Sequence, residues 1–158
     1  MSGERQDLLS RSALGVFRLN GQFLAVAEEL ARPAGLTAAW WQVLGAVLGE
    51  PLPVSGIARA MGITRQSVQR IADLLVERGL AEYRPNPAHR RAKLLAPTAQ
   101  GRAAITRIDP GHTAFADRLA EAFGEAELTE AVRMLERLSK VLDQVGLPGT
   151  PPPPVTEP

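Results

Sequence analysis

Residues 53–97, PVSGIARAMGITRQSVQRIADLLVERGLAEYRPNPAHRRAKLLAP, hold the most regular pattern of the chain. Their first apolar residues recur at the spacing i, i+3, i+4, i+7 of a helix with one buried face; these are Val54, Ile57, Ala58 and Met61. Gly62 ends this helix, and Thr64 stands where its side chain can cap a second helix over 64–78. The buried stripe of the second helix is Val68, Ile71, Ala72 and Leu75. Two helices joined by a short turn with a glycine predict a helix-turn-helix.

The polar side chains of the second helix gather near its N-terminal end and face away from the buried stripe. They are Thr64 at the cap, then Arg65, Gln66, Ser67, Gln69 and Arg70. Arginine matches the acceptor edge of guanine, and glutamine matches the donor–acceptor edge of adenine, so these side chains can read bases in a major groove. Any solvent-exposed helix also presents arginine and glutamine, so this helix alone leaves both interpretations open.

The next residues predict a β-hairpin with a basic loop. Gly79 ends the helix, residues 80–84 alternate as a half-buried strand does, and residues 92–96 can return as its partner. Pro85 and Pro87 cannot continue either strand, so the loop between the strands must project. Basic residues occupy the loop and its root: Arg84, His89, Arg90, Arg91 and Lys93. A basic hairpin directly after such a helix is typical of a wing that reaches phosphates or the minor groove.

At these residues the sequence resembles the MarR family of winged helix-turn-helix transcriptional regulators. The similar pieces are GLT at 35–37, the run 57–101 and a leucine-spaced terminal helix, so the resemblance covers roughly residues 8–145. In that family the wing commonly carries acidic residues ahead of its arginine pair, and an Asp–Arg salt bridge steadies the loop. Here Asn86 and His89 hold those places, while Arg90 and Arg91 are retained.

The resemblance implies a mainly α fold with a small β-hairpin wing. A single domain over 1–146 would combine a winged helix-turn-helix DNA-binding lobe, at about 37–97, with a helical dimerisation lobe. Helices at about 5–32 and 98–145 would form that second lobe. Residues 147–158, six of which are proline, predict a disordered tail.

Positive charge is concentrated on the helix-turn-helix and the hairpin. The whole chain has a formal net charge of only +1. Residues 54–107, however, hold ten Lys/Arg against three Asp/Glu, while residues 1–53 hold four against five and residues 108–158 hold four against nine. This division is the electrostatic pattern expected of a nucleic-acid-binding face.

Long helices are expected on both sides of this stretch. Residues 5–32 predict one helix that Pro33 and Gly35 stop, and Thr37 can cap another over 38–48. Within residues 126–145, apolar residues repeat at spacings of three and four, close to a coiled-coil seam: Leu128, Val132, Leu135, Leu138, Leu142 and Val145. Together with the first helix, this seam predicts a homodimer interface, and packing within one protomer is the alternative.

A helix capped by Thr98, with Ile105 and Ile108 facing inward, follows the hairpin. We predict a kink or a break near Asp109, because the residue before Pro110 is pushed out of the helical region and a glycine follows. A separate helix over 112–123 would come next. In the resembling family a long helix usually crosses this point, so the prediction departs from the family's pattern.

The resemblance also implies regulation by a small molecule. Family members often bind a phenolic or other aromatic effector between the dimerisation lobe and the DNA-binding lobe. Candidates for the lining of such a pocket are Phe17, Trp40, Trp41 and His112. Core packing is the ordinary role of a tryptophan pair, and His112 also fits a plain helix-start position.

The sequence lacks the patterns of an enzyme. It contains no cysteine, its two histidines have no ligand or nucleophile spacing, and it has no glycine-rich phosphate loop, so neither a metal nor a cofactor is expected. No apolar run approaches the roughly 20 residues of a membrane span, and the N-terminus lacks the order of a secretion signal. We therefore expect a cytoplasmic protein without a membrane partner.

These patterns favour a sequence-specific regulator that binds double-stranded DNA as a homodimer on a pseudo-palindromic operator. The resemblance adds the expectation of a repressor that a small aromatic ligand modulates. Two other classes remain open: a winged helix used for protein–protein assembly, and a small-molecule-binding protein without a specific DNA target. The first of these would show little preference for DNA sequence and would not need the basic segment.

Overall fold

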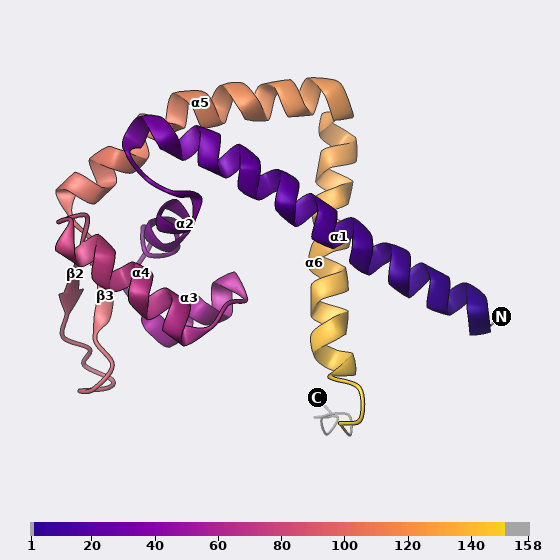
Figure 1. Ribbon diagram of the computed structural model, residues 1–158, viewed down its shortest axis with the longest axis horizontal. Helices are drawn as coiled ribbons and strands as arrows, with labels where there is room; N and C mark the ends of the chain where they lie inside the picture. The colour runs from indigo at the N-terminus through magenta and orange to yellow at the C-terminus, as the bar shows by residue number, and fades with distance from the viewer. Residues whose placement is uncertain (1, 151–158) are drawn as a thin grey trace. The chain divides into compact units, whose positions relative to one another are not determined.

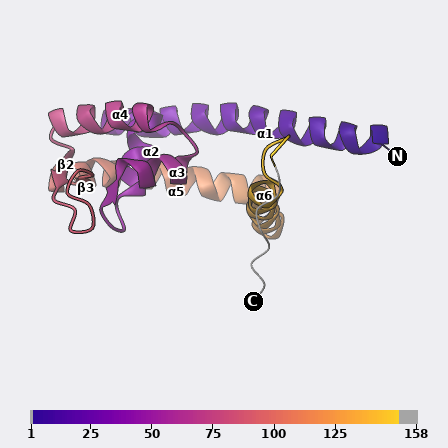
Figure 2. The ribbon, with the colours of Figure 1, turned by 90° about the horizontal axis from the view of Figure 1, so that it is seen from below.

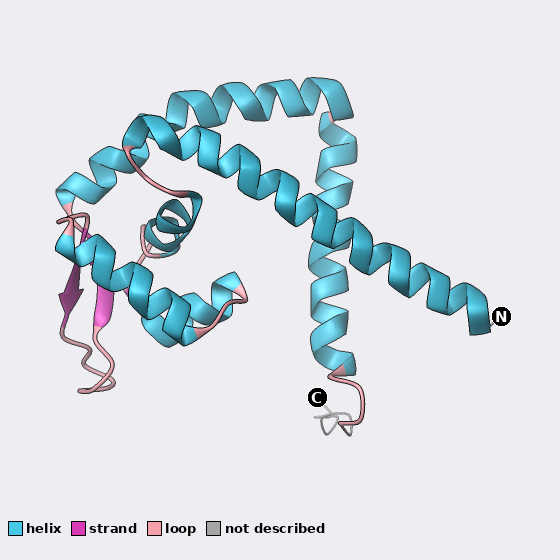
Figure 3. Cartoon of the chain, viewed as in Figure 1, coloured by secondary structure: helices cyan, strands magenta, loops and turns pink. Residues whose placement is uncertain are grey.

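The structure is a computed structural model that describes residues 2–150, and most of the predicted Pro-rich tail lies outside them. It is mainly helical, with strands confined to one small sheet (Figure 3). The elements in chain order are α1 (Ser2–Ala31), η1 (Arg32–Ala34), α2 (Ala38–Ala46), β1 (Leu52–Pro53), α3 (Val54–Met61), α4 (Arg65–Glu77), β2 (Ala81–Arg84), β3 (Leu94–Pro97), α5 (Ala99–Phe123) and α6 (Glu125–Val145) (Figure 1). The chain divides into two compact units between His112 and Thr113.

The core of the first unit draws one or more large side chains from each of five elements. Leu44 of α2, Ile57 of α3, Leu75 of α4, Leu95 of β3 and Ile108 of α5 are among its largest fully buried side chains. Full burial of such a side chain stabilises the fold by about 1.5–3 kcal/mol relative to exposure. The helix-turn-helix is therefore held from behind by α2, the sheet and the first half of α5.

The helix-turn-helix has the bounds that the sequence predicts. Helix α3 ends at Met61, and Gly62 adopts the left-handed conformation at φ +67° that ends a helix without steric strain. Thr64 then caps α4, because its Oγ1 accepts a hydrogen bond from the Ser67 backbone N–H at 3.1 Å. The same device starts α2, where Thr37 Oγ1 accepts from the Trp40 N–H.

The predicted hairpin is present, and it gains a third strand that the sequence pattern did not reveal. The sheet order is β1-β3-β2, with both pairs antiparallel. Leu95 of β3 lies opposite Leu52 on one side and opposite Tyr83 on the other. In both ribbon views the loop between β2 and β3 projects from the end of the hairpin, away from α1 (Figures 1 and 2). We call this loop, residues 85–93, the wing loop.

The predicted break of helix α5 near Asp109 is wrong. The helix runs without interruption from Ala99 to Phe123 with Pro110 inside it, so residues 112–123 are not a separate helix. An internal proline costs about 3 kcal/mol because it removes a hydrogen bond and crowds the preceding turn. Packing on this part of the helix opposes that cost. Ile108 is buried, Leu30 of α1 lies against Gly111, and Trp41 of α2 contacts His112.

None of the helices in residues 2–150 combines the length and the apolar character that a membrane span needs.

Candidate nucleic-acid interface

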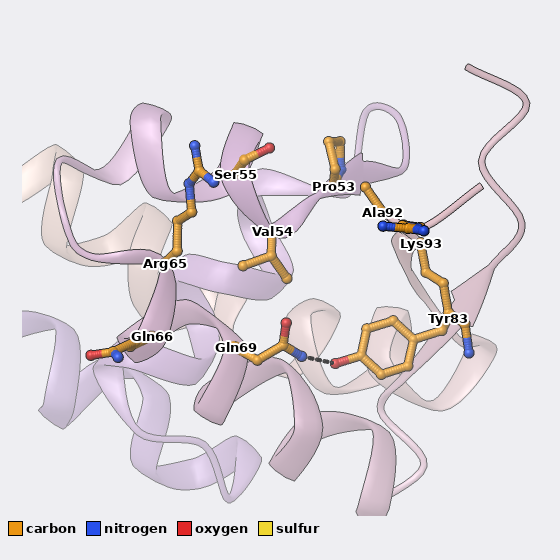
Figure 4. A pocket seen from close by; sticks show the side chains of 10 residues that line it. Pro53, Val54, Ser55, Arg65, Gln66, Gln69, Tyr83, Ala92 and Lys93 are labelled. Atoms are coloured by element: carbon orange, nitrogen blue, oxygen red, sulfur yellow. Dashed lines mark hydrogen bonds between the residues drawn. The ribbon is translucent and has the colours of Figure 1, made fainter. Parts of the chain in front are cut away.

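An open groove of about 560 Å³ lies between α4, the junction of β1 with α3, and the hairpin, to which β2 and the wing loop contribute (Figure 4). Its walls come from three parts of the sequence: Pro53, Val54 and Ser55; Arg65, Gln66 and Gln69; and Tyr83, Arg91, Ala92 and Lys93. Three of these ten side chains are cationic, and none is a carboxylate. The groove therefore brings the predicted base-reading helix and the predicted wing together on one basic surface.

The N-terminal end of α4 presents polar groups to solvent. Arg65, Gln66 and Arg70 are exposed, as the helical pattern predicts. Thr64 and Ser67 are engaged with each other, because Thr64 Oγ1 donates to Ser67 Oγ at 2.9 Å while accepting from the Ser67 N–H. The Ser67 hydroxyl hydrogen is not used in this pair, so it can still be donated to a phosphate or a base.

The wing loop is held by the side chain of Asn86. Its Nδ2 donates to the Ala92 carbonyl at 2.8 Å, and its Oδ1 accepts from the Ala88 N–H at 3.0 Å. The backbone adds bonds from the His89 N–H to the Asn86 carbonyl and from the Ala92 N–H to the His89 carbonyl. An uncharged amide thus spans the loop at the place where acidic residues are common in the resembling family.

The cations of the hairpin differ in their surroundings. His89, Arg90, Arg91 and Lys93 are exposed, and only Arg91 and Lys93 of these four line the groove. Arg84 is paired with Glu82, whose Oε1 accepts from the Arg84 guanidinium at 2.8 Å. Since both side chains are about half exposed, this ion pair is weak and Arg84 can exchange it for a phosphate.

A hydrogen-bonded cluster joins α4 to β2 at one wall of the groove. Gln69 Nε2 donates to the Tyr83 hydroxyl oxygen at 2.9 Å (Figure 4). It also donates to Asp73 Oδ1 at 3.0 Å, and the Tyr83 hydroxyl donates to the same Oδ1 at 2.5 Å. Burial raises the pKa of Tyr83 to about 12, and the hydrogen bond to Asp73 and its negative charge act in the same direction. The hydroxyl therefore stays protonated and keeps donating at neutral pH.

The structure brings two of the four pocket candidates into contact. The rings of Trp41 and His112 meet edge to face, with centroids 5.5 Å apart and an interplanar angle of 87°. Trp40 lies half-buried on the core and is covered by the Arg78 guanidinium at 5.5 Å from the ring centroid. Phe17 is 70 % exposed on α1. Both tryptophans also pack against the core, which agrees with their ordinary role.

Sequence reasoning missed three polar residues of this interface: Ser55 on the groove wall, and Asp73 and Tyr83 in the cluster. Gln69 and Asp73 stand four residues apart, a spacing at which helical side chains meet, so that pair could have been anticipated. Tyr83 lies fourteen residues from Gln69 in the sequence, and only the packing of β2 on α4 reveals the contact. Among the described residues, no group of three or more His, Asp or Glu could hold a metal ion.

A helix-turn-helix followed by a hairpin with a projecting basic loop defines a winged helix-turn-helix protein. The MarR family model matches residues 34–92. An uncharacterised protein of Mycobacterium tuberculosis is 39 % identical over 132 residues, covering 84 % of this chain and 92 % of its own. A solved MarR family transcription regulator, SP03579, superposes with a TM-score of 0.73 at 24 % identity, over 90 % of this chain and 95 % of its own.

A second solved structure is the transcriptional repressor CouR bound to a 23-mer DNA duplex. It has a TM-score of 0.70 and 28 % identity, and covers 79 % of this chain and 89 % of its own. CouR from Rhodococcus jostii RHA1 bound to p-coumaroyl-CoA has a TM-score of 0.63 at 26 % identity, over 80 % of this chain and 87 % of its own. The chain belongs to the MarR family. Members of this family are transcription regulators and not enzymes.

Proposed function

We propose that this protein is a transcriptional regulator that binds double-stranded DNA by sequence. The observation that carries the proposal is the groove in which polar side chains of α4 and cations of the hairpin share one surface. A helix fits a major groove, and its exposed side chains can then reach base edges. CouR, similar to this chain at 28 % identity, has been solved on a DNA duplex, which supports the same use of the surface here.

The roles proposed for the side chains follow their positions. Arg65, Gln66, Gln69 and Arg70 read bases, and Thr64 and Ser67 lie at the same end of the helix, within reach of a base or a phosphate. Arg90, Arg91 and His89 bind the backbone or the minor groove from the wing loop, where arginine is favoured by the negative potential. Arg84 and Lys93 add phosphate contacts at the root of the wing.

The proposal includes a homodimer, because both terminal helices expose apolar side chains in the single chain. On α1 these include Leu9, Phe17 and Phe23, which are more than half exposed. On α6, five of the six predicted seam residues are exposed, and Leu128 is half-buried; the exposed ones are Val132, Leu135, Leu138, Leu142 and Val145. Apolar faces of this extent mark contact sites on soluble proteins, and a second copy of the chain would cover them. The dimer then carries two copies of α4 as its recognition helices, and these two helices require a pseudo-palindromic operator.

Repression modulated by a small aromatic ligand completes the proposal. The Trp41 and His112 rings offer an aromatic face and a hydrogen-bonding nitrogen at one place. CouR has been solved with p-coumaroyl-CoA, which carries a phenolic group, and this supports an aromatic effector for the present chain. Such a ligand acts only if it binds one arrangement of the two recognition helices better than another.

The experiment is fluorescence-anisotropy binding to a duplex from the region upstream of the protein's own gene, against a scrambled duplex, across a salt series. We expect a preference of about 1000-fold or more and a steep loss of affinity with salt. The Arg91→Ala variant should weaken binding to both duplexes and reduce the salt slope by about 1. Arg70→Ala should instead relax the preference at one base pair by roughly 1–3 kcal/mol.

Arg107→Ala is the matched control, because Arg107 is an exposed arginine of α5 that does not line the groove. It removes the same charge and should leave both affinities close to those of the wild-type protein. Equal losses on specific and scrambled duplexes for Arg70→Ala would overturn the base-reading role of α4. Negligible binding at every salt concentration would mean that the winged helix serves another partner.

A further inference from the structure

The side chain of Gln69 is fixed in one orientation by its two neighbours. A carboxylate can only accept hydrogen bonds, so the amide group that faces Asp73 at 3.0 Å must be the NH₂ group. Since the Tyr83 hydroxyl gives its own hydrogen to Asp73, its oxygen also accepts from Nε2 of Gln69. The two O/N orientations of this amide are therefore not equivalent, and the opposite one would place Oε1 against a carboxylate.

The consequence is that the group which Gln69 leaves free for a partner is its acceptor oxygen, Oε1. Nε2 is turned toward the cluster and donates to both of its acceptors, and among the described residues none donates to Oε1. Figure 4 shows the amide nitrogen directed at Tyr83 and the oxygen pointing away from it, toward the Val54 side of the groove. At this position the groove of the protein therefore presents a hydrogen-bond acceptor to a bound base. A glutamine without these neighbours would present a donor and an acceptor together.

We propose, on the basis of the DNA-binding function above, that Asp73 and Tyr83 make Gln69 a one-sided reader that accepts from a base amino group and does not donate to a purine N7. In the major groove the amino donors are adenine N6 and cytosine N4. A free glutamine binds adenine through both N6 and N7, so the cluster replaces a bidentate contact by a single directional one. Asp73 and Tyr83 act through Gln69 and are positioning residues.

The fold also holds the cluster of Gln69, Asp73 and Tyr83 in place before a base is bound. Gln69 and Asp73 stand one turn apart on α4, and Tyr83 comes from β2, so the three groups are held by two elements packed on each other. The Tyr83 ring rests partly buried against the core, which fixes the hydroxyl in place. A side chain whose rotamer is already restricted loses less entropy when it binds.

The test begins with selection of preferred duplexes from a random-sequence library by the wild-type protein and by Gln69→Ala. The base pair whose preference disappears in Gln69→Ala is the one that Gln69 reads. Two modified duplexes are then made at that pair. One has the purine N7 replaced by carbon, and the other lacks the amino group of the adenine or cytosine.

We expect the wild-type protein to bind the N7-modified duplex as tightly as the natural one, and to bind the amino-lacking duplex about threefold to tenfold more weakly. In the double variant Asp73→Ala/Tyr83→Phe the amide is free, so loss of N7 should now weaken binding to a similar extent. Glu77→Ala is the matched control, because it removes one negative charge from the same face region of α4 and leaves the cluster intact. It should respond to both duplexes as the wild-type protein does.

Equal sensitivity of the wild-type protein and the double variant to loss of N7 would overturn the inference, as would a Gln69→Ala variant with unchanged base preferences. In both cases the enrichment of a sequence by the wild-type protein would leave the DNA-binding function standing. A library from which the wild-type protein enriches no sequence would overturn the proposed function, and this inference with it. Thermal unfolding of each variant shows that it is folded before binding is compared.

Discussion

A glycine is required at position 101 because the backbone of Leu80, the residue just before β2, passes directly over it. A Cβ built on Gly101 would lie 2.0 Å from the Leu80 carbonyl oxygen, and that oxygen also accepts from the Thr98 N–H. Gly101→Ala should therefore lower the free energy of unfolding by about 1–3 kcal/mol or more, measured by denaturant or thermal unfolding. Gly45→Ala in α2 is the control, since nothing lies within 4 Å of its Cβ position. It should stabilise the fold by about 0.5–1 kcal/mol. Similar effects of the two changes would contradict the close approach.

Tyr83 gives a second residue-level prediction, because it is the single tyrosine of the chain and its ionisation can be followed alone. Its pKa is raised from 10.0 to about 12, so the neutral phenol is favoured in the folded protein. The contribution to stability is complete below pH 10, where the unfolded chain is also neutral, and is lost as the pH rises from about 10 to about 12. Ultraviolet absorbance of tyrosinate should show the raised pKa.

Asp73→Ala should move the pKa of Tyr83 toward its ordinary value, because both the hydrogen bond and the nearby negative charge disappear. Burial remains, so part of the shift should persist. A titration of Tyr83 at its ordinary pKa in the wild-type protein would show that the cluster does not form in solution.

Among the elements, the wing loop yields a prediction about local order. Asn86→Ala removes both side-chain hydrogen bonds that span the loop, so the loop should open more often. Trypsin should then cut after Arg90 and Arg91 several times faster than in the wild-type protein, while the melting temperature changes little. His89→Ala is the control, since His89 contributes backbone groups to the bonds of the loop. Unchanged cleavage of Asn86→Ala would show that Asn86 does not hold the loop.

The elements that the sequence predicted well are those with a local cause. The apolar spacing from Val54 to Met61, the threonine caps at Thr37 and Thr64, and Gly62 are all short-range signals, and each prediction is confirmed. The sequence also indicated the hairpin, although β3 begins at Leu94 and not at Ala92, because Asn86 closes the loop onto Ala92.

The elements that could not be predicted from the sequence depend on partners that are distant in the chain. Strand β1 has only two residues, Leu52 and Pro53, so it carries no alternating pattern and forms because β3 offers an edge. Helix α5 continues through Pro110 because Leu30 and Trp41 pack on the residues that follow, and no local rule contains those contacts. For the interface, helical spacing predicted which side chains of α4 face outward. It could not show that Gln69 is bound on one side by a residue of β2.

At the scale of the whole molecule, the proposed dimer predicts that a charge on the α6 seam separates two chains. Leu138→Glu should weaken self-association by more than about 100-fold, because an unpaired charge would be buried twice in a symmetric interface. Sedimentation or light scattering should then report the mass of one chain at concentrations where the wild-type protein reports two. Binding to a palindromic duplex should weaken in parallel.

Gln144→Glu is the matched control, because Gln144 lies on another face of α6 and the change adds the same single charge. It should leave the mass and the DNA affinity unchanged. A wild-type protein with the mass of one chain at all concentrations would contradict the dimer, and so would a Leu138→Glu variant that still associates.

The wing loop is held by an uncharged side chain, that of Asn86, and this determines how DNA binding by the whole protein should respond to ionic strength. A loop held by an ion pair would loosen as added salt screens that pair, so a salt titration would mix loop opening with the release of counterions from DNA. The hydrogen bonds of the Asn86 side chain join uncharged groups, so added salt leaves them in place. The slope of log affinity against log salt concentration should therefore count the phosphates that the protein neutralises, and little else.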